Sequence, residues 1–285
     1  MKTALTSALL AFLLAGPALG ADLQGTLKKI KDSNTISMGY RESSPPFSFA
    51  GVPGKPAGYS VDLCVRIAAG IQRDLGLNNL QTRWVPVTVD DRMAAVANGT
   101  IDIECGSTTN TLSRQEQVDF SYQTFVDGGS LLVTAASGIK NVADLGGKRV
   151  ALIPGTTTEK ALKEAIAKAY VNPQFVTVKD HAEGVATLEK GTADAYASDM
   201  VLLIGLAAAI KDRVQLRLAE DYFSYEPYGL MVRRNDSAFR LAVNRTLANL
   251  YRTGDILSIF AKWFGAMGTP SPMLKAMYLL NGLPD

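Results

Sequence analysis

The segment ECGSTTNTLSR, residues 104–114, places hydroxyl and amide side chains directly after a short run of alternating apolar and polar residues. Ser107 and Thr109 supply hydroxyl groups, and Arg114 supplies a guanidinium group. A guanidinium group binds a carboxylate through two parallel hydrogen bonds, and hydroxyls beside it can donate further ones. The segment therefore favours a binding site for an anion. A polar loop that caps the next helix is the alternative, because Ser, Thr and Asn are preferred N-cap residues.

More polar and charged residues stand where predicted strands end and predicted helices begin. Arg41 follows the first strand, and Arg92 stands near the start of a helix. The segment PGTTTE, residues 154–159, leads from a strand into a helix, whose first N–H groups favour an anion. His181 and Asp199 each follow a strand. Because the same kind of position recurs, we interpret these residues as parts of one binding site.

Each of these residues also has an interpretation that needs no ligand. Arg92 fits a solvated position on a helix, and Thr156 and Thr157 fit simple N-caps. Asp199 fits a cap of the helix that follows it, and a lone histidine such as His181 is more often structural. The sequence alone leaves these alternatives open.

Strands and helices alternate along the chain, which predicts an α/β fold with a largely parallel sheet. Val61, Val65 and Ala68 recur at the spacing of an amphipathic helix. The predicted strands cover residues 35–40, 81–87, 148–153, 174–178 and 193–197. The predicted helices begin near residues 58, 90, 156 and 182, and a long helical pattern covers 237–264.

An internal repeat relates the two halves of the chain. The pattern Gly-Thr-x-Asp occurs at 99–102 and at 191–194, each time between a predicted helix and a predicted strand. Eight residues beyond the two glycines stand Ser107 and Asp199. We expect these residues to occupy matching places at the carboxyl ends of equivalent strands, where open α/β sheets bind ligands. A chance similarity is the alternative, since a four-residue match is weak by itself.

Two similar halves predict a hinged pair of lobes that closes on a small ligand. Residues 128–129 are expected to form one crossing between the lobes, and residues 228–232 the return crossing. Lobe 1 is then expected to comprise residues 21–127 and 226–285, and lobe 2 residues 128–225.

The composition excludes several classes of function. The 285 residues carry a formal net charge of only +2, with both signs interspersed, so no nucleic-acid surface is expected. Two cysteines and one histidine are too few for a structural zinc site, and no cofactor is expected. Whether Cys64 and Cys105 form a disulfide stays open, because pairing depends on geometry.

The N-terminus has the pattern of a secretory signal peptide. Lys2 supplies the positive charge, residues 4–14 form an apolar stretch, and residues 18–20 resemble a cleavage site. A membrane span needs about 20 apolar residues, and Gly16-Pro17 interrupts this stretch. We expect residues 1–20 to be removed and the mature chain to be soluble and exported.

These segments together resemble the periplasmic solute-binding proteins that bind polar amino acids for ABC transporters, and among them the members specific for glutamate and aspartate. The resemblance covers nearly the whole mature chain. GSTTN followed four residues later by an arginine is its most specific part. The other segments are GYRESSPPFSF, GYSVDLC, PGTTTEKAL, KDHAEG, EPYGLMVRR and KWF.

The resemblance implies the type II fold, with two lobes, two hinge crossings and the ligand in the cleft between them. It implies a periplasmic monomer that does not catalyse a reaction. The expected partners are an amino acid, glutamate or aspartate, and an ABC permease in the inner membrane, without any nucleic acid.

The resemblance also implies a role for each residue that faces the backbone groups of the amino acid. Arg114 would bind the α-carboxylate, with Ser107 and Thr109 beside it. Asp199 would hold the α-ammonium group, and Thr157 would add a hydrogen bond from the second lobe.

By the same resemblance, Arg41, Arg92 and His181 would face the side-chain carboxylate of the ligand. A dicarboxylic amino acid carries one more negative charge than a neutral one, which gives the extra arginines a chemical purpose. We expect Arg41 to contribute most to selectivity. Val89 stands where the glutamate/aspartate group can offer a hydroxyl, and this departure affects the preference between glutamate and aspartate.

Three other functions compete with this hypothesis. One is a broader receptor that also takes glutamine and asparagine. Another is a cyclohexadienyl dehydratase acting on arogenate or prephenate, which shares the fold but needs a general acid near the substrate ring. Asp199 is better explained as a partner for an ammonium group, so we expect no enzyme. A chemosensory role would use the same lobes with another partner.

Overall fold

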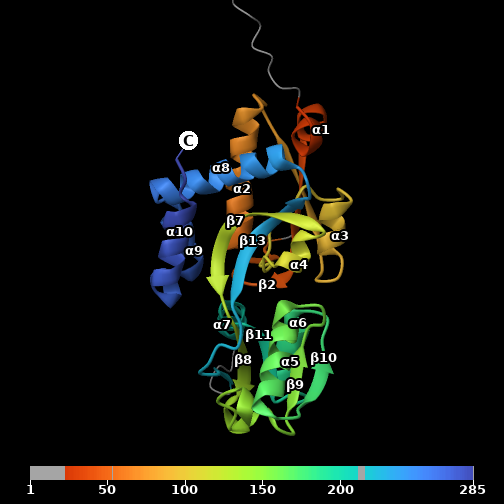
Figure 1. Cartoon of the computed structure of the whole chain (residues 1–285), viewed down its shortest axis with the longest axis vertical. Helices are drawn as coiled ribbons and strands as arrows, with labels where there is room; N and C mark the ends of the chain where they lie inside the picture. The colour runs from red at the N-terminus through yellow and green to blue at the C-terminus, as the bar shows by residue number, and fades with distance from the viewer. Residues whose placement is uncertain (1–22, 53, 211–215, 285) are drawn as a thin grey trace, which may run out of the picture.

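The computed structural model describes residues 23–52, 54–210 and 216–284, which form two lobes placed end to end along the longest axis (Figure 1). The expected signal peptide, residues 1–20, lies outside the described residues. Within the described part of the chain, no helix combines the length and the apolar composition that crossing a membrane requires.

Lobe 1, the upper lobe in Figure 1, is built on a five-stranded sheet with the order β5-β1-β6-β13-β7. Strand β13 runs antiparallel to its neighbours, and the other four point the same way. The strands are β1 (Thr35–Tyr40), β5 (Gln81–Pro86), β6 (Ile103–Glu104), β7 (Val118–Asp127) and β13 (Glu226–Arg233). A small second sheet consists of β2 (Ser43–Ser44), β3 (Ser48–Ala50) and β4 (Pro56–Ala57).

The helices of lobe 1 come from the first part of the described chain, drawn red to yellow in Figure 1, and from its C-terminal part, drawn blue. They are α1 (Gly25–Ser33), α2 (Tyr59–Asp74), α3 (Arg92–Ala97), α4 (Leu112–Gln115), α8 (Ser237–Thr253), α9 (Asp255–Phe264), η4 (Gly265–Met267) and α10 (Pro272–Asn281).

Lobe 2 has a five-stranded sheet with the order β10-β9-β11-β8-β12. Here β8 is the strand that runs against the other four. The strands are β8 (Gly129–Thr134), β9 (Arg149–Leu152), β10 (Gln174–Thr177), β11 (Ala195–Asp199) and β12 (Leu216–Leu218). The helices are η1 (Ala135–Ser137), η2 (Val142–Leu145), α5 (Thr157–Ala169), α6 (His181–Glu189) and α7 (Met200–Ala209).

The prediction of a largely parallel sheet is confirmed, with one exception in each lobe. The two reversed strands, β8 and β13, are the strands that enter from the other lobe. A strand that enters a lobe from the hinge side must run against strands that end there, which explains the exception.

The predicted repeat is also confirmed, because β6 and β11 occupy the same middle place in the two sheets. The Asp102 carboxylate accepts a hydrogen bond from the backbone N–H of Ser37 in β1 at 2.7 Å. The Asp194 carboxylate likewise accepts one from the backbone N–H of Arg149 in β9 at 2.8 Å. Each aspartate thus ties its own strand to the parallel neighbour, which is a structural reason for the Gly-Thr-x-Asp pattern.

The first crossing between the lobes is at Gly128, as predicted, because β7 lies in one sheet and β8 in the other. The predicted return crossing at 228–232 is wrong, since these residues pair with β7 inside lobe 1. The chain instead returns at 219–225, between β12 and β13. Gly229 lies at a register shift of β13, so this glycine belongs to a β-bulge and not to a crossing between the lobes.

Two helix predictions need correction. The pattern over 237–264 is two helices, α8 and α9, because Gly254 adopts a positive φ of 80° and ends α8. Val65 was expected on the apolar face of α2, but half of its surface is exposed. The buried face of this helix instead includes Cys64 and Ile67.

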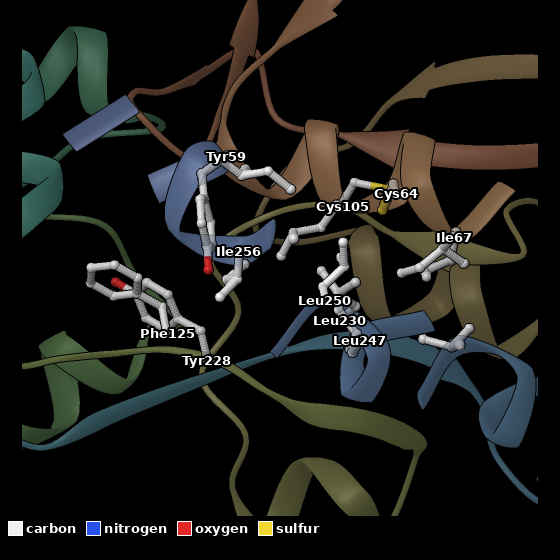
Figure 2. Packing of buried hydrophobic residues seen from close by; sticks show 14 of the residues in the cluster. Tyr59, Cys64, Ile67, Cys105, Phe125, Tyr228, Leu230, Leu247, Leu250 and Ile256 are labelled. Carbon is white, nitrogen blue, oxygen red and sulfur yellow. A yellow bond between two sulfur atoms is a disulfide. The ribbon is translucent and has the colours of Figure 1, made fainter. Parts of the chain in front are cut away.

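Figure 2 shows the aromatic side chains of Tyr59, Phe125 and Tyr228 on one side of the core of lobe 1 and the disulfide of Cys64 and Cys105 on the other. Phe264, near the end of α9, packs against Tyr59 and Phe125, which confirms the expected contact of the C-terminal helices with lobe 1. Cys64 and Cys105 form a disulfide with a Cα–Cα distance of 6.1 Å. The bond joins α2 to the end of β6, two residues before Ser107.

Replacing both cysteines by alanine is expected to lower the free energy of unfolding by about 4 kcal/mol. The disulfide closes a loop with a sequence separation of 41 residues, and opening it restores the entropy of the unfolded chain. Urea denaturation of the oxidised protein and of the double variant measures the difference. The reduced wild-type protein serves as control and should match the variant; a loss below about 1 kcal/mol would contradict the prediction.

Candidate functional site

A cavity lies between the two lobes, and its volume is about 410 Å³ when its open mouth is included. All eight residues that the sequence predicted as a site line it. They are Arg41, Arg92, Ser107, Thr109 and Arg114 from lobe 1, and Thr157, His181 and Asp199 from lobe 2. Val89, Ile153, Thr156, Thr158, Ala197, Ser198 and Leu202 complete the wall.

The fold brings these residues together because strand ends and helix starts meet at the cleft. Arg41 follows β1, and Ser107 and Thr109 follow β6. Thr157 is the first residue of α5, and Asp199 is the last residue of β11. The N–H groups of Thr157 and Thr158, at the start of α5, have no acceptor within the helix, so they too are available to an anion at the cavity wall.

Three arginines are buried around this cavity: Arg41, Arg92 and Arg114. Burial, followed by the nearby charge of Arg92, lowers the pKa of Arg41 and of Arg114 to about 10 each. Arg41 and Arg114 therefore remain protonated at neutral pH, and burial also lowers the pKa of Arg92. Within the described residues the Arg41 guanidinium makes no hydrogen bond, so its donors are free for a ligand.

The other two guanidinium groups are held by the polar residues of the opening motif. Arg114 Nη1 donates to the backbone oxygen of Thr109 at 2.8 Å, and Arg92 Nη1 donates to Thr108 Oγ1 at 2.7 Å. Thr108 in turn donates to Glu104 Oε2 at 3.0 Å. The buried Glu104 carboxylate acts against the lowering of the pKa of Arg41 and Arg92, so it is a counter-charge behind the arginines.

His181 is buried and neutral at physiological pH. Burial, and then the charges of Arg41 and Arg92, lower its pKa to about 3. Its Nδ1 lies 2.6 Å from the hydroxyl of Tyr196. When Tyr196 donates this bond, the ring proton of His181 is on Nε2. His181 is then a neutral hydrogen-bond donor and adds no positive charge to those of Arg41 and Arg92.

The neutral state of His181 predicts a pH dependence of stability. Its folded pKa, about 3, lies below the ordinary value of 6.5, so between these values the unfolded chain binds a proton that the folded chain does not. Wild-type protein should therefore lose about 2 kcal/mol relative to His181→Gln as the pH falls from 6.5 to 5. Denaturant melts of both proteins measure it, and a difference that stays constant over this range would refute the assignment.

Asp199 joins the two lobes rather than capping α7. Its Oδ1 accepts from Thr158 Oγ1 at 2.7 Å, and its Oδ2 accepts from the hydroxyl of Tyr228 in lobe 1. The side chain makes no capping hydrogen bond to α7, so the capping interpretation is wrong. Burial, and then the charge of Glu226, raise the pKa of Asp199 to about 6.

Thr156 and Thr157 have different functions. Thr156 is a simple N-cap, because its hydroxyl accepts from the backbone N–H of Glu159 at 3.0 Å. Thr157 is not: its hydroxyl lies 3.1 Å from that of Thr109 and donates to Glu226 at 2.7 Å. Thr157 thus connects lobe 2 to lobe 1.

Glu226, Tyr228, Glu104 and Tyr196 are polar residues around the cavity that the sequence analysis did not assign. Glu226 and Tyr228 lie in the segment EPYGLMVRR, where a glutamate before an apolar strand offers a recognisable signal of a buried charge. Glu104 lies within the opening motif itself, at the end of β6. Tyr196 had no such signal, because its position inside the apolar strand β11 is typical of a core residue.

Comparisons with known proteins agree with this geometry. The family model of bacterial extracellular solute-binding proteins, family 3, matches residues 36–266. An L-glutamate/L-aspartate-binding protein of Pseudomonas aeruginosa is 42% identical over 91% of this chain and 86% of its own length. A glutamate/aspartate import solute-binding protein of Escherichia coli is 37% identical over 88% of this chain and 82% of its own length.

The solved structure of an ancestral arginine-binding protein bound to glutamine is similar as well. It is 29% identical, has a TM-score of 0.71, and the match covers 81% of this chain and 98% of that one. The expected fold, with two lobes, two crossings and a cleft between them, is confirmed.

Proposed function

Because the chain belongs to the bacterial extracellular solute-binding proteins, family 3, we propose that it binds L-glutamate or L-aspartate between its lobes and delivers it to an ABC permease. Its role is binding rather than catalysis. The observation that carries the proposal is the burial of three arginines in one cavity that also presents the Asp199 carboxylate. Such a cavity matches a ligand with two carboxylates and one ammonium group.

The α-groups of the amino acid would bind at the strand ends near the hinge. Arg114 would pair with the α-carboxylate, and Ser107 and the N–H groups at the start of α5 lie on the same cavity wall. Asp199 would accept hydrogen bonds from the α-ammonium. Its two present donors, Thr158 and Tyr228, keep the carboxylate oriented and leave lone pairs on both oxygens.

The side-chain carboxylate would lie against Arg41, Arg92 and His181. Arg41 has free donors, and the neutral His181 adds a hydrogen bond without adding another charge. Val89 also lines the cavity but offers only methyl groups, so the arginines would supply most of the binding energy.

Localisation and assembly complete the proposal. We place the mature chain in the periplasm after removal of residues 1–20, as a monomer that does not bind nucleic acid, with the permease in the inner membrane. Residues 21–127 and 226–285 would move as lobe 1, and residues 128–225 as lobe 2. The position of Gly128 between β7 and β8 supports the first of these boundaries.

A thermal-shift screen of the mature protein against the twenty amino acids tests the proposal. A ligand that binds only the native state raises its apparent stability, so glutamate or aspartate should give the largest shift. Equal shifts with glutamine and asparagine would favour the broader receptor. A larger shift with a basic amino acid would refute the dicarboxylate assignment, and turnover of arogenate would refute the role as a binding protein.

A further inference from the structure

Glu226, which does not line the cavity, controls two hydroxyl groups that do. It is the first residue of β13 and is buried. One of its oxygens, Oε2, accepts hydrogen bonds from Thr109 of lobe 1 at 2.6 Å and from Thr157 of lobe 2 at 2.7 Å. The other oxygen, Oε1, accepts from Ser224 at 2.6 Å. A single carboxylate oxygen therefore holds one threonine from each lobe.

These contacts determine where the hydroxyl protons point. Each threonine hydroxyl has one proton and two lone pairs. Because charge-assisted hydrogen bonds are short and strong, both protons point to Glu226. The two hydroxyl oxygens nevertheless lie only 3.1 Å apart, and no proton remains to lie between them. The pair therefore presents lone pairs to the cavity and can only accept hydrogen bonds there.

We propose that Glu226 turns Thr109 and Thr157 into hydrogen-bond acceptors, which complete with Asp199 an ammonium subsite shared by both lobes. This inference rests on the proposed function and specifies one part of its site. Thr109 then acts on the ammonium group, whereas Arg114, Ser107 and the start of α5 remain for the α-carboxylate. An ammonium group supplies the donor that the two oxygens lack, so it would hold the lobes together.

The subsite predicts selection against ligands without a donor at the α-carbon. The probe is 2-oxoglutarate, which has the same two carboxylates as glutamate but a carbonyl oxygen in place of the ammonium. Three acceptors would face this oxygen, and buried polar groups left unpaired weaken binding strongly. Isothermal titration of the mature wild-type protein should show glutamate binding at least roughly 100-fold more tightly than 2-oxoglutarate.

Two substitutions separate the direction of the protons from the charge of Glu226. Glu226→Met removes both the charge and the acceptor, which frees the threonine protons to donate to a carbonyl oxygen. Glu226→Gln removes the charge but keeps an amide oxygen for the threonines, with its NH₂ group toward Ser224. We expect Glu226→Met to reduce the preference for glutamate over 2-oxoglutarate at least 10-fold, and Glu226→Gln to retain most of it.

The outcomes distinguish this inference from the proposed function. If wild-type protein binds no acidic amino acid, the proposed function fails first. If it binds glutamate but Glu226→Met lowers the affinities for glutamate and 2-oxoglutarate equally, Glu226 is only structural. If Glu226→Met and Glu226→Gln lose the preference for glutamate equally, only the charge of Glu226 matters. Either result overturns the inference. Thr157→Val, at the half-buried start of α5, should reproduce part of the loss should Glu226→Met fold poorly. Ser224→Ala, the matched control, should leave the preference unchanged.

Discussion

Arg114→Ala is expected to weaken the binding of glutamate and of glutamine alike, by roughly 100- to 1,000-fold. Both amino acids carry the α-carboxylate that Arg114 would hold through charge-assisted hydrogen bonds. The guanidinium is already oriented by its bond to the Thr109 backbone, so little entropy is lost when the ligand binds. Isothermal titration with both amino acids measures the two losses.

The control for this variant is Arg73→Ala, which removes an arginine that is largely exposed on α2 and should not change either affinity. Arg114→Lys keeps a positive charge but loses the paired geometry, so it should give an intermediate loss. A much larger loss for glutamate than for glutamine would show that Arg114 contacts the side chain instead of the α-carboxylate.

Arg41→Ala is expected to weaken glutamate by roughly 100-fold but glutamine by less than about 10-fold. Only glutamate offers a second carboxylate to the free donors of Arg41. The same substitution removes a buried cation that stands near Arg92, so the ligand-free protein should melt at a higher temperature than wild type.

Titration with both amino acids and thermal melts without ligand check the two parts of this prediction. Val89→Ala is a matched control on the same cavity wall, and it should change the two affinities by similar, small factors. If Arg41→Ala lowers the affinities for glutamate and for glutamine by equal factors, Arg41 does not contact the side chain of the ligand.

The location of the site could be predicted because it depends on local patterns. Ser107 and Asp199 each follow a short strand and a Gly-Thr-x-Asp turn, and parallel strands bring their ends to one edge of a sheet. The aspartates at 102 and 194 then tie each strand to its neighbour. Periodicity and turn chemistry act over a few residues, so they can be read directly from the chain.

The errors arose where the structure depends on contacts between distant segments. The return crossing was expected at 228–232, but cross-strand pairing with β7 keeps these residues in lobe 1. The spacing of Val65 along α2 suits burial, yet half of its surface is exposed because the rest of lobe 1 does not cover this side of the helix. The alternative role of Asp199 as a helix cap was locally plausible, but its side chain bonds to Tyr228 from the other lobe instead.

By itself, the sequence determined the α/β class, the repeat of two lobes and eight of the residues that line the cleft, because each follows from local spacing and from the resemblance to a known family. Only the tertiary structure decided whether Cys64 and Cys105 pair, which groups surround His181 and which hydroxyls Glu226 holds. Thr109 and Glu226 are 117 residues apart in the chain, and the second donor, Thr157, belongs to the other lobe. The direction of a hydroxyl proton depends on which acceptor the fold brings within hydrogen-bond distance, and no local pattern carries that information.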